Sequence, residues 1–564
     1  MNKKWGQGQL FAFSGLDGET DVKNDLVGTL SADRISITFH TKVRRELALV
    51  GHGAKNITFS AVTSDYINVT FDANRNARFM FYKNGIVVGN VPENSYLTVF
   101  CEGEALPCDA PDGVSVQNTG DGQVTALAKR DGKFCFALAL DTQTAIDRAI
   151  SGLEADLEGL CEQKEGYYAR HNISSGEYAG LYSKCVSVMK TQIYSPEGRF
   201  KQRWSTPDRL PHRFLWLWDS VFHAIGHRNL DGGLAEELIL SVLDTQKEDG
   251  MIPHMSSPGW SSDITQPPVL AWGALKVFER THNQQFLKRV FDANAKFLGW
   301  CDQNRKPKGA ELYSWNTADK VDCRCDESGM DNSPRFDEPI LLQTIDFSCF
   351  MANEMRCMAK IADILQLDKK YFVERFELIK NDINKYLWSE EDGFYYDRNV
   401  ADGTLYKVGS VASFLPLFSG VATPDRVKDI VKPLSDPQKF GRKCLIPCLE
   451  YNQPTFGTDM WRGPVWINYN YMIAEGFDNY EMPELAKKLR LGTIDMVNKW
   501  YKQSGTVFEF YDSENITPPW CLNRKGDVVE PYDFKVRYQS IRDYGWTSTL
   551  TFDLLCELIK GKKI

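Results

Sequence analysis

The chain has 564 residues, of which 43% are hydrophobic and 25% charged, a composition typical of a folded globular protein. Its 75 Asp and Glu residues outnumber 66 Lys and Arg residues, which gives a net charge of −9. The chain has no long basic stripe and no apolar run of about 18 residues, so we expect neither nucleic acid nor a membrane as a partner.

The first residues, Met1 to Gly8, carry two lysines with no apolar stretch behind them, which does not indicate a signal peptide. The chain has 14 cysteines, and several of them lie in helical or strand patterns: Cys135, Cys185, Cys357 and Cys556. This placement favours buried thiols in a reducing compartment, so we expect a cytoplasmic protein.

Two cysteine groups and one histidine pair are candidate metal ligands. Cys323 with Cys325, and Cys444 with Cys448, lack the paired spacing of a zinc site. His223 and His227 lie one helical turn apart, with Asp219 one turn earlier, but core or capping histidines are more common than ligands in such a position. We therefore expect no metal and no other cofactor.

The first 145 residues alternate short β-type runs with turn dipeptides. Residues 34–39 and 67–71 alternate apolar and polar side chains, and residues 78–82 precede Asn84-Gly85, a hairpin signal. This pattern predicts an antiparallel β-sandwich domain over residues 1–145. A charged helical pattern follows, and we expect residues 146–175 to form a linker helix.

The rest of the chain, residues 176–564, has the periodicity of helices. Apolar residues between Tyr178 and Met189 recur on one helical face. Eleven further segments have a helical pattern: 218–230, 233–247, 265–281, 284–303, 342–363, 369–386, 406–418, 423–434, 459–476, 481–501 and 537–559. Twelve helices with unequal connections predict an (α/α)6 barrel; an α-solenoid would also pair its helices, but no sequence repeats at a fixed period.

Four segments combine polar and aromatic residues where a plain turn between helices would need neither. They are residues 211–220, 250–268, 326–337 and 506–512. Asp219 in the first of them could be a helix N-cap, which would be a purely structural role. Long connections at one end of a rigid scaffold commonly carry the functional site.

Two of these segments supply carboxylates suited to acid–base chemistry. Residues 326–337 contain four carboxylates interleaved with Gly329, Met330 and Phe336, which a solvated acidic loop would not need. Glu509 alternates with aromatic residues, and a carboxyl group against aromatic walls has a raised pKa. Two carboxylates across an aromatic cleft are the minimum equipment for hydrolysis of a glycosidic bond.

These residues make the sequence similar to a known family. Residues 327–337 resemble the acid-bearing loop of glycoside hydrolase family 63, residues 460–469 its Trp-Arg-Gly-Pro-x-Trp segment, and residues 508–511 its base-bearing segment. Three shorter matches also resemble trehalases of family 37 or both families: Trp218-Asp219-Ser220, Gln266-Pro267-Pro268 and Tyr544-Gly545-Trp546-Thr547. The six matches occur in a consistent order across residues 200 to 550.

The resemblance implies an (α/α)6 catalytic barrel and inversion at the anomeric carbon. It implies Asp331 as general acid and Glu509 as general base. It also implies that four residues line the sugar pocket: Asp219, Gln266, Arg462 and Trp466. We assign six more to substrate binding: Trp216, Trp315, Arg335, Trp461, Asn468 and Trp546. Members of the family act on α-glucosides or on mannosyl- and glucosylglycerate.

We therefore expect an inverting exo-α-glycosidase, most simply an α-glucosidase, whose partner is a small carbohydrate: a disaccharide, a short oligosaccharide or a glycosylglycerate. The alternatives are a trehalase, a disaccharide phosphorylase on the same barrel, a non-catalytic sugar-binding protein and an epimerase. A phosphorylase would leave the base position vacant, and such epimerases use histidines, which neither carboxylate segment contains. The sugar, the linkage, the leaving group and the oligomeric state stay open.

Overall fold

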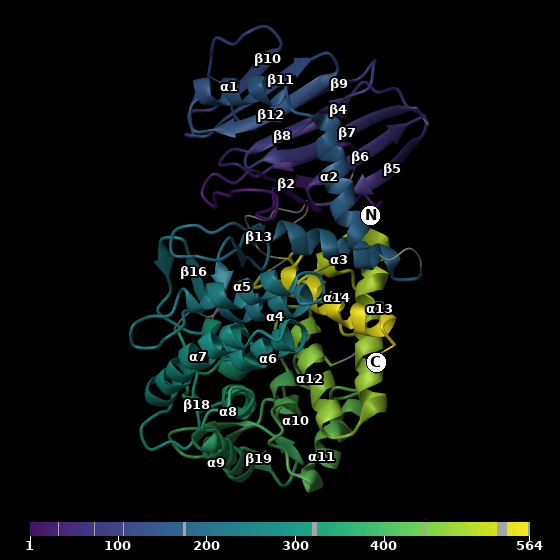
Figure 1. Cartoon of the computed structure of the whole chain (residues 1–564). Helices are drawn as coiled ribbons and strands as arrows, with labels where there is room; N and C mark the ends of the chain where they lie inside the picture. Colours follow the sequence, from purple (N-terminus) through teal and green to yellow (C-terminus); the bar gives the residue numbers. More distant parts are fainter. Residues whose placement is uncertain are drawn as a thin grey trace.

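A computed structural model gives the fold of the chain. It describes all residues except 32, 73, 105, 173–175, 319–323, 444–445, 527–538 and 562–564. Figure 1 shows a strand-rich N-terminal region next to a larger helical region, with α2 and α3 at the junction between them.

The N-terminal region contains two antiparallel sheets, with strand orders β1-β2-β3-β4-β9 and β10-β11-β12-β8-β7-β6-β5. The strands are β1 Leu10–Ala12, β2 Val27–Leu30, β3 Ser36–Phe39, β4 Arg45–Val50, β5 Ile57–Val62, β6 Tyr66–Phe71, β7 Arg75–Lys83, β8 Ile86–Asn90, β9 Tyr96–Cys101, β10 Val114–Asn118, β11 Val124–Arg130 and β12 Lys133–Ala139. The predicted antiparallel sheets are confirmed, and β7 and β8 form the hairpin predicted at Asn84-Gly85.

One hydrophobic core joins the two sheets. Alternate residues of the strands, among them Phe11, Leu47, Val69 and Phe136, pack into it. Successive side chains of a strand point to opposite faces of the sheet. Burial of one face therefore explains why apolar and polar residues alternate in the sequence.

The segment predicted as one linker helix contains two helices. The first, α1 (Thr142–Gly152), packs on β11 and β12, where Ala145 and Ala149 meet Cys135. The second, α2 (Leu157–Arg170), starts at the N-cap Asp156 and leads toward α3. The expectation of a single helix was wrong because the apolar face of α1 covers the sheet, and the chain must turn before α2.

The helical region contains the twelve predicted helices. They are α3 Ala179–Thr191, α4 Leu217–His227, α5 Gly232–Leu243, α6 Leu270–Thr281, α7 Gln284–Asn304, α8 Ile345–Ile364, α9 Lys370–Tyr386, α10 Leu415–Ser419, α11 Pro424–Val431, α12 Ile467–Asn479, α13 Pro483–Ser504 and α14 Gly545–Ile559. Short strands lie in the connections: β13 Ile193–Tyr194, β14 Trp204–Ser205, β15 Leu215–Trp216, β16 Met255–Ser257, β17 Trp260–Ser261, β18 Leu342–Gln343, β19 Trp388–Ser389, β20 Phe394–Tyr395, β21 Asp397–Asn399 and β22 Leu405–Tyr406.

Six of these helices contact one another in a closed cycle: α4, α6, α8, α10, α12 and α14, with α14 returning to α4. Five others pack against members of the cycle: α3 on α14, α5 on α4 and α6, α7 on α6 and α8, α9 on α8, and α13 on α12 and α14. All 11 residues of α4 are buried, whereas only Phe372, Ile379 and Ile383 of the 17 residues of α9 are. A helix buried on every side belongs to the inner layer, and an amphipathic one to the outer layer.

Several helices begin later than the sequence pattern predicts. The predicted helices from 265, 459 and 537 begin at Leu270, Ile467 and Gly545, because the described residues that precede them are not helical and some of them line a cavity: Gln266, Met460, Trp461, Trp466 and Tyr544. The predicted helix 406–418 contains β22, a 3-10 turn at Val411–Phe414 and only then α10. Within the described residues, no helix is both long and apolar enough to span a bilayer.

Candidate active site

A cavity of about 310 Å³ lies where the inner helices begin. Its walls come from segments that directly precede or start α4, α6, α12 and α14, together with the loop before α8. Eight of the residues assigned from sequence line this cavity: Trp216, Asp219, Gln266, Asp331, Trp461, Trp466, Glu509 and Trp546. The two predicted catalytic carboxylates, far apart in the chain, therefore lie on the walls of one hollow.

The loop that carries Asp331 is held in place by buried contacts. Glu327, which is fully buried, accepts two hydrogen bonds from the Arg305 guanidinium at 2.8 and 2.9 Å and one from the Thr265 amide at 3.0 Å. Gly329 has φ of +70°, and a Cβ atom there would approach the Trp218 indole to 2.3 Å. Only glycine fits this position. Gly329 therefore lets the loop before Asp331 pass close to Trp218, which lines the same cavity.

Asp331 forms an ion pair with Lys525, whose Nζ lies 2.6 Å from Oδ2. Burial acts to raise the pKa of Asp331, but Lys525, followed by Arg524 and His254, outweighs burial and holds the pKa below its usual value. The Asp331 side chain is 20% exposed, so it is open to the cavity. Without a ligand, this carboxyl group is held in its charged form.

Glu509 lies in the segment 506–511, and its side chain is almost completely buried. Its amide donates to the Ile541 carbonyl at 2.9 Å, and neighbouring Phe510 packs on Trp466. Arg524 donates from Nε and a terminal nitrogen to both carboxylate oxygens, at 2.7 and 3.1 Å. A two-pronged guanidinium contact of this kind stabilises a carboxylate and fixes its plane.

Asp219 is a third carboxyl group in the cavity. The N-cap of α4 is Trp216, so the alternative role of Asp219 as an N-cap is wrong. Its Oδ1 atom is buried and has no hydrogen-bond partner among the residues that the structure describes. Burial, together with the nearby carboxylates of Asp208, Glu509 and Asp331, raises the pKa of Asp219 well above its usual value. A buried carboxyl oxygen that lacks a partner is suited to binding a hydroxyl group of a ligand.

Aromatic side chains form most of the wall. Trp461 and Trp466 stack at 3.8 Å between ring centroids, and Trp546 meets Trp466 edge-on at 5.7 Å. Within the described part of the chain, three buried indole N–H groups have no hydrogen-bond acceptor: those of Trp216, Trp461 and Trp546. Flat apolar faces beside unpaired donors match a ligand that presents both C–H faces and hydroxyl groups, as a sugar does.

Gln266 combines a structural contact with its place in the cavity. It is 3% exposed, and its Oε1 accepts a hydrogen bond from the Trp218 amide in the first turn of α4 at 3.3 Å. Gln266 thus joins the segment before α6 to the start of α4.

Four residues assigned to substrate binding do not line this cavity. Arg335 is buried between Asp346 and Asp397, and Trp315 donates to Asp346 while it stacks on Phe347. Arg462 pairs instead with the exposed Asp337. Asn468 is fully buried in α12. Arg335 and Trp315 support the loop region around Asp331. They were assigned to substrate binding because ion pairing and packing use the same residue types as sugar binding.

The cavity also contains residues that the sequence reasoning did not find, chiefly Arg524, Lys525, His212 and His254. Burial lowers the pKa of His254 to about 4, so this ring is neutral near pH 7, with Nδ1 2.6 Å from the Ser262 hydroxyl. The only signal for the two cations was their adjacency in a non-helical segment.

The predicted metal candidates have other surroundings. His223 Nδ1 lies 2.7 Å from the Ser205 hydroxyl, and Cys448 accepts the Gly463 amide. Cys323 and Cys444 lie outside the described residues. Over the part of the chain that the structure covers, no three His, Cys, Asp or Glu side chains are grouped as a metal site would require.

Comparison with known proteins relates this site to glycoside hydrolases. Residues 212–547 match the model of the mannosylglycerate hydrolase MGH1-like glycoside hydrolase domain. The mannosylglycerate hydrolase of Thermus thermophilus is 26% identical over 375 residues, which are 51% of this chain and 86% of that protein. Mannosylglycerate hydrolase MGH2 of Selaginella moellendorffii is 25% identical over 55% of this chain and 77% of its own length.

A solved structure also resembles this chain. A family 63 mannosylglycerate hydrolase from T. thermophilus, solved in complex with glucose, matches with a TM-score of 0.54 and 23% identity. The match covers 66% of this chain and 99% of that protein. The family model begins at residue 212, so the N-terminal sheets lie outside it.

Proposed function

Because this chain belongs to the MGH1-like family of glycoside hydrolases, we propose that it is an inverting exo-α-glycosidase with Asp331 as general acid and Glu509 as general base. The observation that carries the proposal is the convergence of these two carboxyl groups on one small, tryptophan-walled cavity. In an inverting reaction one carboxyl group protonates the leaving oxygen while the other removes a proton from the attacking water.

The surroundings of the two groups support these roles. Arg524 donates two hydrogen bonds to the Glu509 carboxylate and fixes its plane, which suits a base that must be aimed at one water molecule. Asp331 faces the same cavity and is held by one flexible side chain, Lys525, which can be displaced. When Lys525 leaves, burial is the dominant effect on Asp331 and favours its protonated, acidic form.

The scaffold in this proposal is an (α/α)6 barrel formed by residues 176–564, with residues 1–145 as a β-sandwich domain. The closed cycle of α4, α6, α8, α10, α12 and α14 inside an outer layer supports this architecture. A cavity at one end of such a barrel accepts the end of a glycoside, which fits exo action. The unpaired thiols buried in the described residues, such as Cys185 and Cys349, fit a cytoplasmic location.

We further propose a glycosylglycerate as the substrate, with glucose or mannose as the sugar. Two cations lie on the cavity wall, Lys525 against the proposed acid Asp331 and Arg524 against the proposed base Glu509. Glycerate carries a carboxylate that can draw Lys525 away from Asp331, whereas a neutral disaccharide offers no such charge. The names of the relatives from T. thermophilus and S. moellendorffii agree with this substrate class.

The test is a panel of α-linked substrates: glucosylglycerate, mannosylglycerate, trehalose and other short glucosides, with proton NMR recording the first anomer released. We expect β-sugar from the glycosylglycerates without added phosphate. Release of the α-anomer would contradict inversion, and formation of a sugar phosphate would replace the hydrolase with a phosphorylase. Trehalose as the preferred substrate would overturn the glycerate proposal alone.

Two variants test the residue roles. Asp331→Asn and Glu509→Gln should each lower kcat by at least about 10²-fold, the lower range for loss of general acid–base catalysis. Asp337→Asn and Glu514→Gln are matched controls, since both carboxylates pair with arginines outside the cavity. Activity of Asp331→Asn or Glu509→Gln near that of the controls would remove the assignment.

A further inference from the structure

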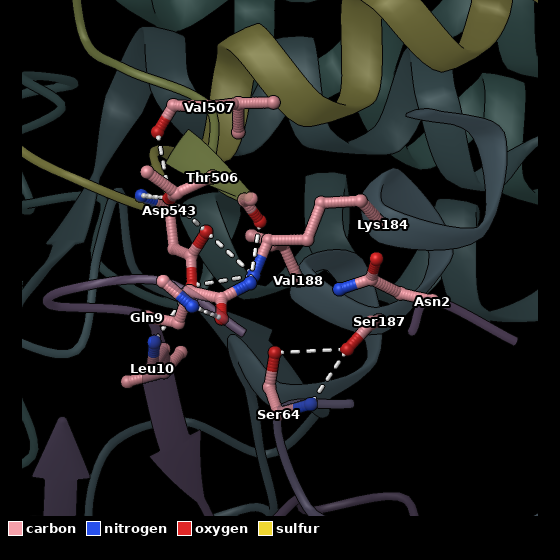
Figure 2. A network of polar contacts seen from close by, with 12 residues as sticks. Asn2, Gln9, Leu10, Ser64, Lys184, Ser187, Val188, Thr506, Val507 and Asp543 are labelled. Carbon is pink, nitrogen blue, oxygen red and sulfur yellow. Dashed lines mark hydrogen bonds and ion pairs between the residues drawn. The ribbon is translucent and has the colours of Figure 1, made fainter. Parts of the chain in front are cut away.

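A buried polar network joins the N-terminal sheets to the segments that carry the active site. Its centre is Asp543, which is 1% exposed and directly precedes Tyr544 on the cavity wall. Figure 2 shows Lys184 of α3 and the backbone of Leu10 of β1 meeting at the Asp543 carboxylate. The distances are 2.8 Å from Lys184 Nζ and 2.7 Å from the Leu10 amide.

Asp543 also holds the segment that leads to Glu509. Its carboxylate accepts a hydrogen bond from the Thr506 hydroxyl, and its amide donates to the Val507 carbonyl at 2.7 Å. Two residues further on, the Glu509 amide donates to Ile541 at 2.9 Å. Segments 506–511 and 541–544 therefore run side by side, and Asp543 fastens them through its contacts with Thr506 and Val507.

The backbone of Asp543 indicates that the surrounding contacts enforce this position. Its φ is +54°, in the left-handed region that residues other than glycine seldom occupy. Such a conformation is less favourable than the usual ones and persists only where neighbouring contacts determine it. The contacts here include one from outside the barrel, the Leu10 amide.

Other contacts along the first residues reinforce the joint. Gln9 donates from its side chain to the Gly505 carbonyl, immediately before Thr506. The Tyr501 hydroxyl donates to Asn2 at 2.6 Å, and Ser64 bonds Ser187 beside the same network. The first residues of the chain thus contact the end of α13 at Tyr501 and the following connection at Gly505.

We propose that Asp543 is a positioning residue for Glu509, and that the N-terminal β region takes part in catalysis by completing the contacts of Asp543. This inference rests on the proposed role of Glu509 as base. A loosened Asp543 would let the 506–511 segment shift, and a base displaced by a fraction of an ångström activates water less well. The 506–511 segment also meets the aromatic wall of the cavity, because Tyr511 and Val465 exchange backbone hydrogen bonds and Phe510 packs on Trp466.

The main test is the double variant Lys184→Met/Asp543→Asn, which removes the interaction without leaving Lys184 as a buried unpaired charge. We expect kcat to fall by about tenfold or more on the best glycoside of the panel, while KM stays within about threefold. Wild-type kcat in the folded variant, or a change confined to KM, would overturn the proposal.

Hydrolysis of an α-glycosyl fluoride tests the general base separately from the general acid. Water attacks the anomeric carbon, the C–F bond breaks, fluoride leaves with the electron pair, and the base takes the proton of water. Fluoride needs little help from an acid, so this substrate should relieve the defect of Asp331→Asn but leave that of the double variant. Relief in both variants would refute a role through Glu509.

A milder pair of variants decides the matter if the double variant does not fold. Gln9→Met removes the hydrogen bond to Gly505, whereas Gln117→Met removes a similarly buried glutamine from the interior of the β region. We expect Gln9→Met to lower kcat at least threefold relative to Gln117→Met at similar melting temperatures. Equal kcat values would overturn the proposal, whereas full activity of Glu509→Gln would instead remove the proposed function itself.

Discussion

The ion pair between Lys525 and Asp331 makes the pH dependence of the enzyme predictable. Replacing Lys525 with Met removes the cation 2.6 Å from the Asp331 carboxylate. Two unit charges about 4 Å apart at an effective dielectric constant of about 20 attract by about 4 kcal/mol, which corresponds to about 3 pKa units. Both side chains retain some solvent contact, so screening reduces this attraction, and we expect the pKa of Asp331 to rise when the cation is removed.

The direction of the change follows from the proposed role. A general acid is active while protonated, so the alkaline limb of the pH profile of kcat/KM reports the pKa of Asp331 in the free enzyme. In Lys525→Met this limb should move to higher pH. Lys525→Arg keeps the charge and should leave the limb near its wild-type position.

The assay is the initial rate of glycoside hydrolysis at low substrate concentration over a range of pH. The pH at which the alkaline limb falls does not depend on the maximal value of kcat/KM. Weaker binding of an anionic leaving group lowers that maximum but does not move the limb along the pH axis. An unchanged limb in Lys525→Met, or one displaced to lower pH, would refute the reasoning that this cation controls the acid.

Two further predictions concern buried charges away from the cavity. Burial raises the pKa of Glu354 from 4.5 to about 7, so its contribution to stability is fully present below about pH 4.5 and is lost as pH rises through 7. The loss is about 3 kcal/mol, and Glu354→Gln should flatten the corresponding part of the pH dependence of urea unfolding; an unaltered slope would contradict this. Arg335→Met leaves Asp346 and Asp397 buried without their cation and should reduce the free energy of unfolding by about 3–5 kcal/mol, with Arg335→Lys recovering only part. A loss below about 1 kcal/mol in Arg335→Met would show that the carboxylates find other partners.

Much of the fold could be predicted because burial imposes a period on the sequence. The apolar period of two located the strands around Val69 and Phe79, and the helical period located all twelve helices. The predicted helix boundaries were wrong where residues are apolar for a reason other than packing in a helix. Met460, Trp461 and Trp466, before Ile467, are apolar because they line a cavity, and a helical pattern search extends the helix into them.

The candidate site could be predicted only as far as its local motifs reach. Asp331 and Glu509 were found because each lies in a short segment with an unusual composition. Arg335 and Trp315 have the same chemistry as sugar-binding residues but support the loop around Asp331 from behind. Lys525 was missed because its importance depends on a partner far away in the sequence, and no local pattern encodes that contact.

The adjacent cations Arg524 and Lys525 provide a physical reason for two carboxyl groups in one cavity to differ. Arg524 holds Glu509 through a rigid fork with two hydrogen bonds, which suits a group that starts each cycle ionised. Lys525 contacts Asp331 through a single ammonium group on a flexible stem, which can move to a negative charge on a substrate. Arrival of an anionic leaving group would then release Asp331 to take up its proton, so binding would prepare the acid only for a substrate that carries the right charge.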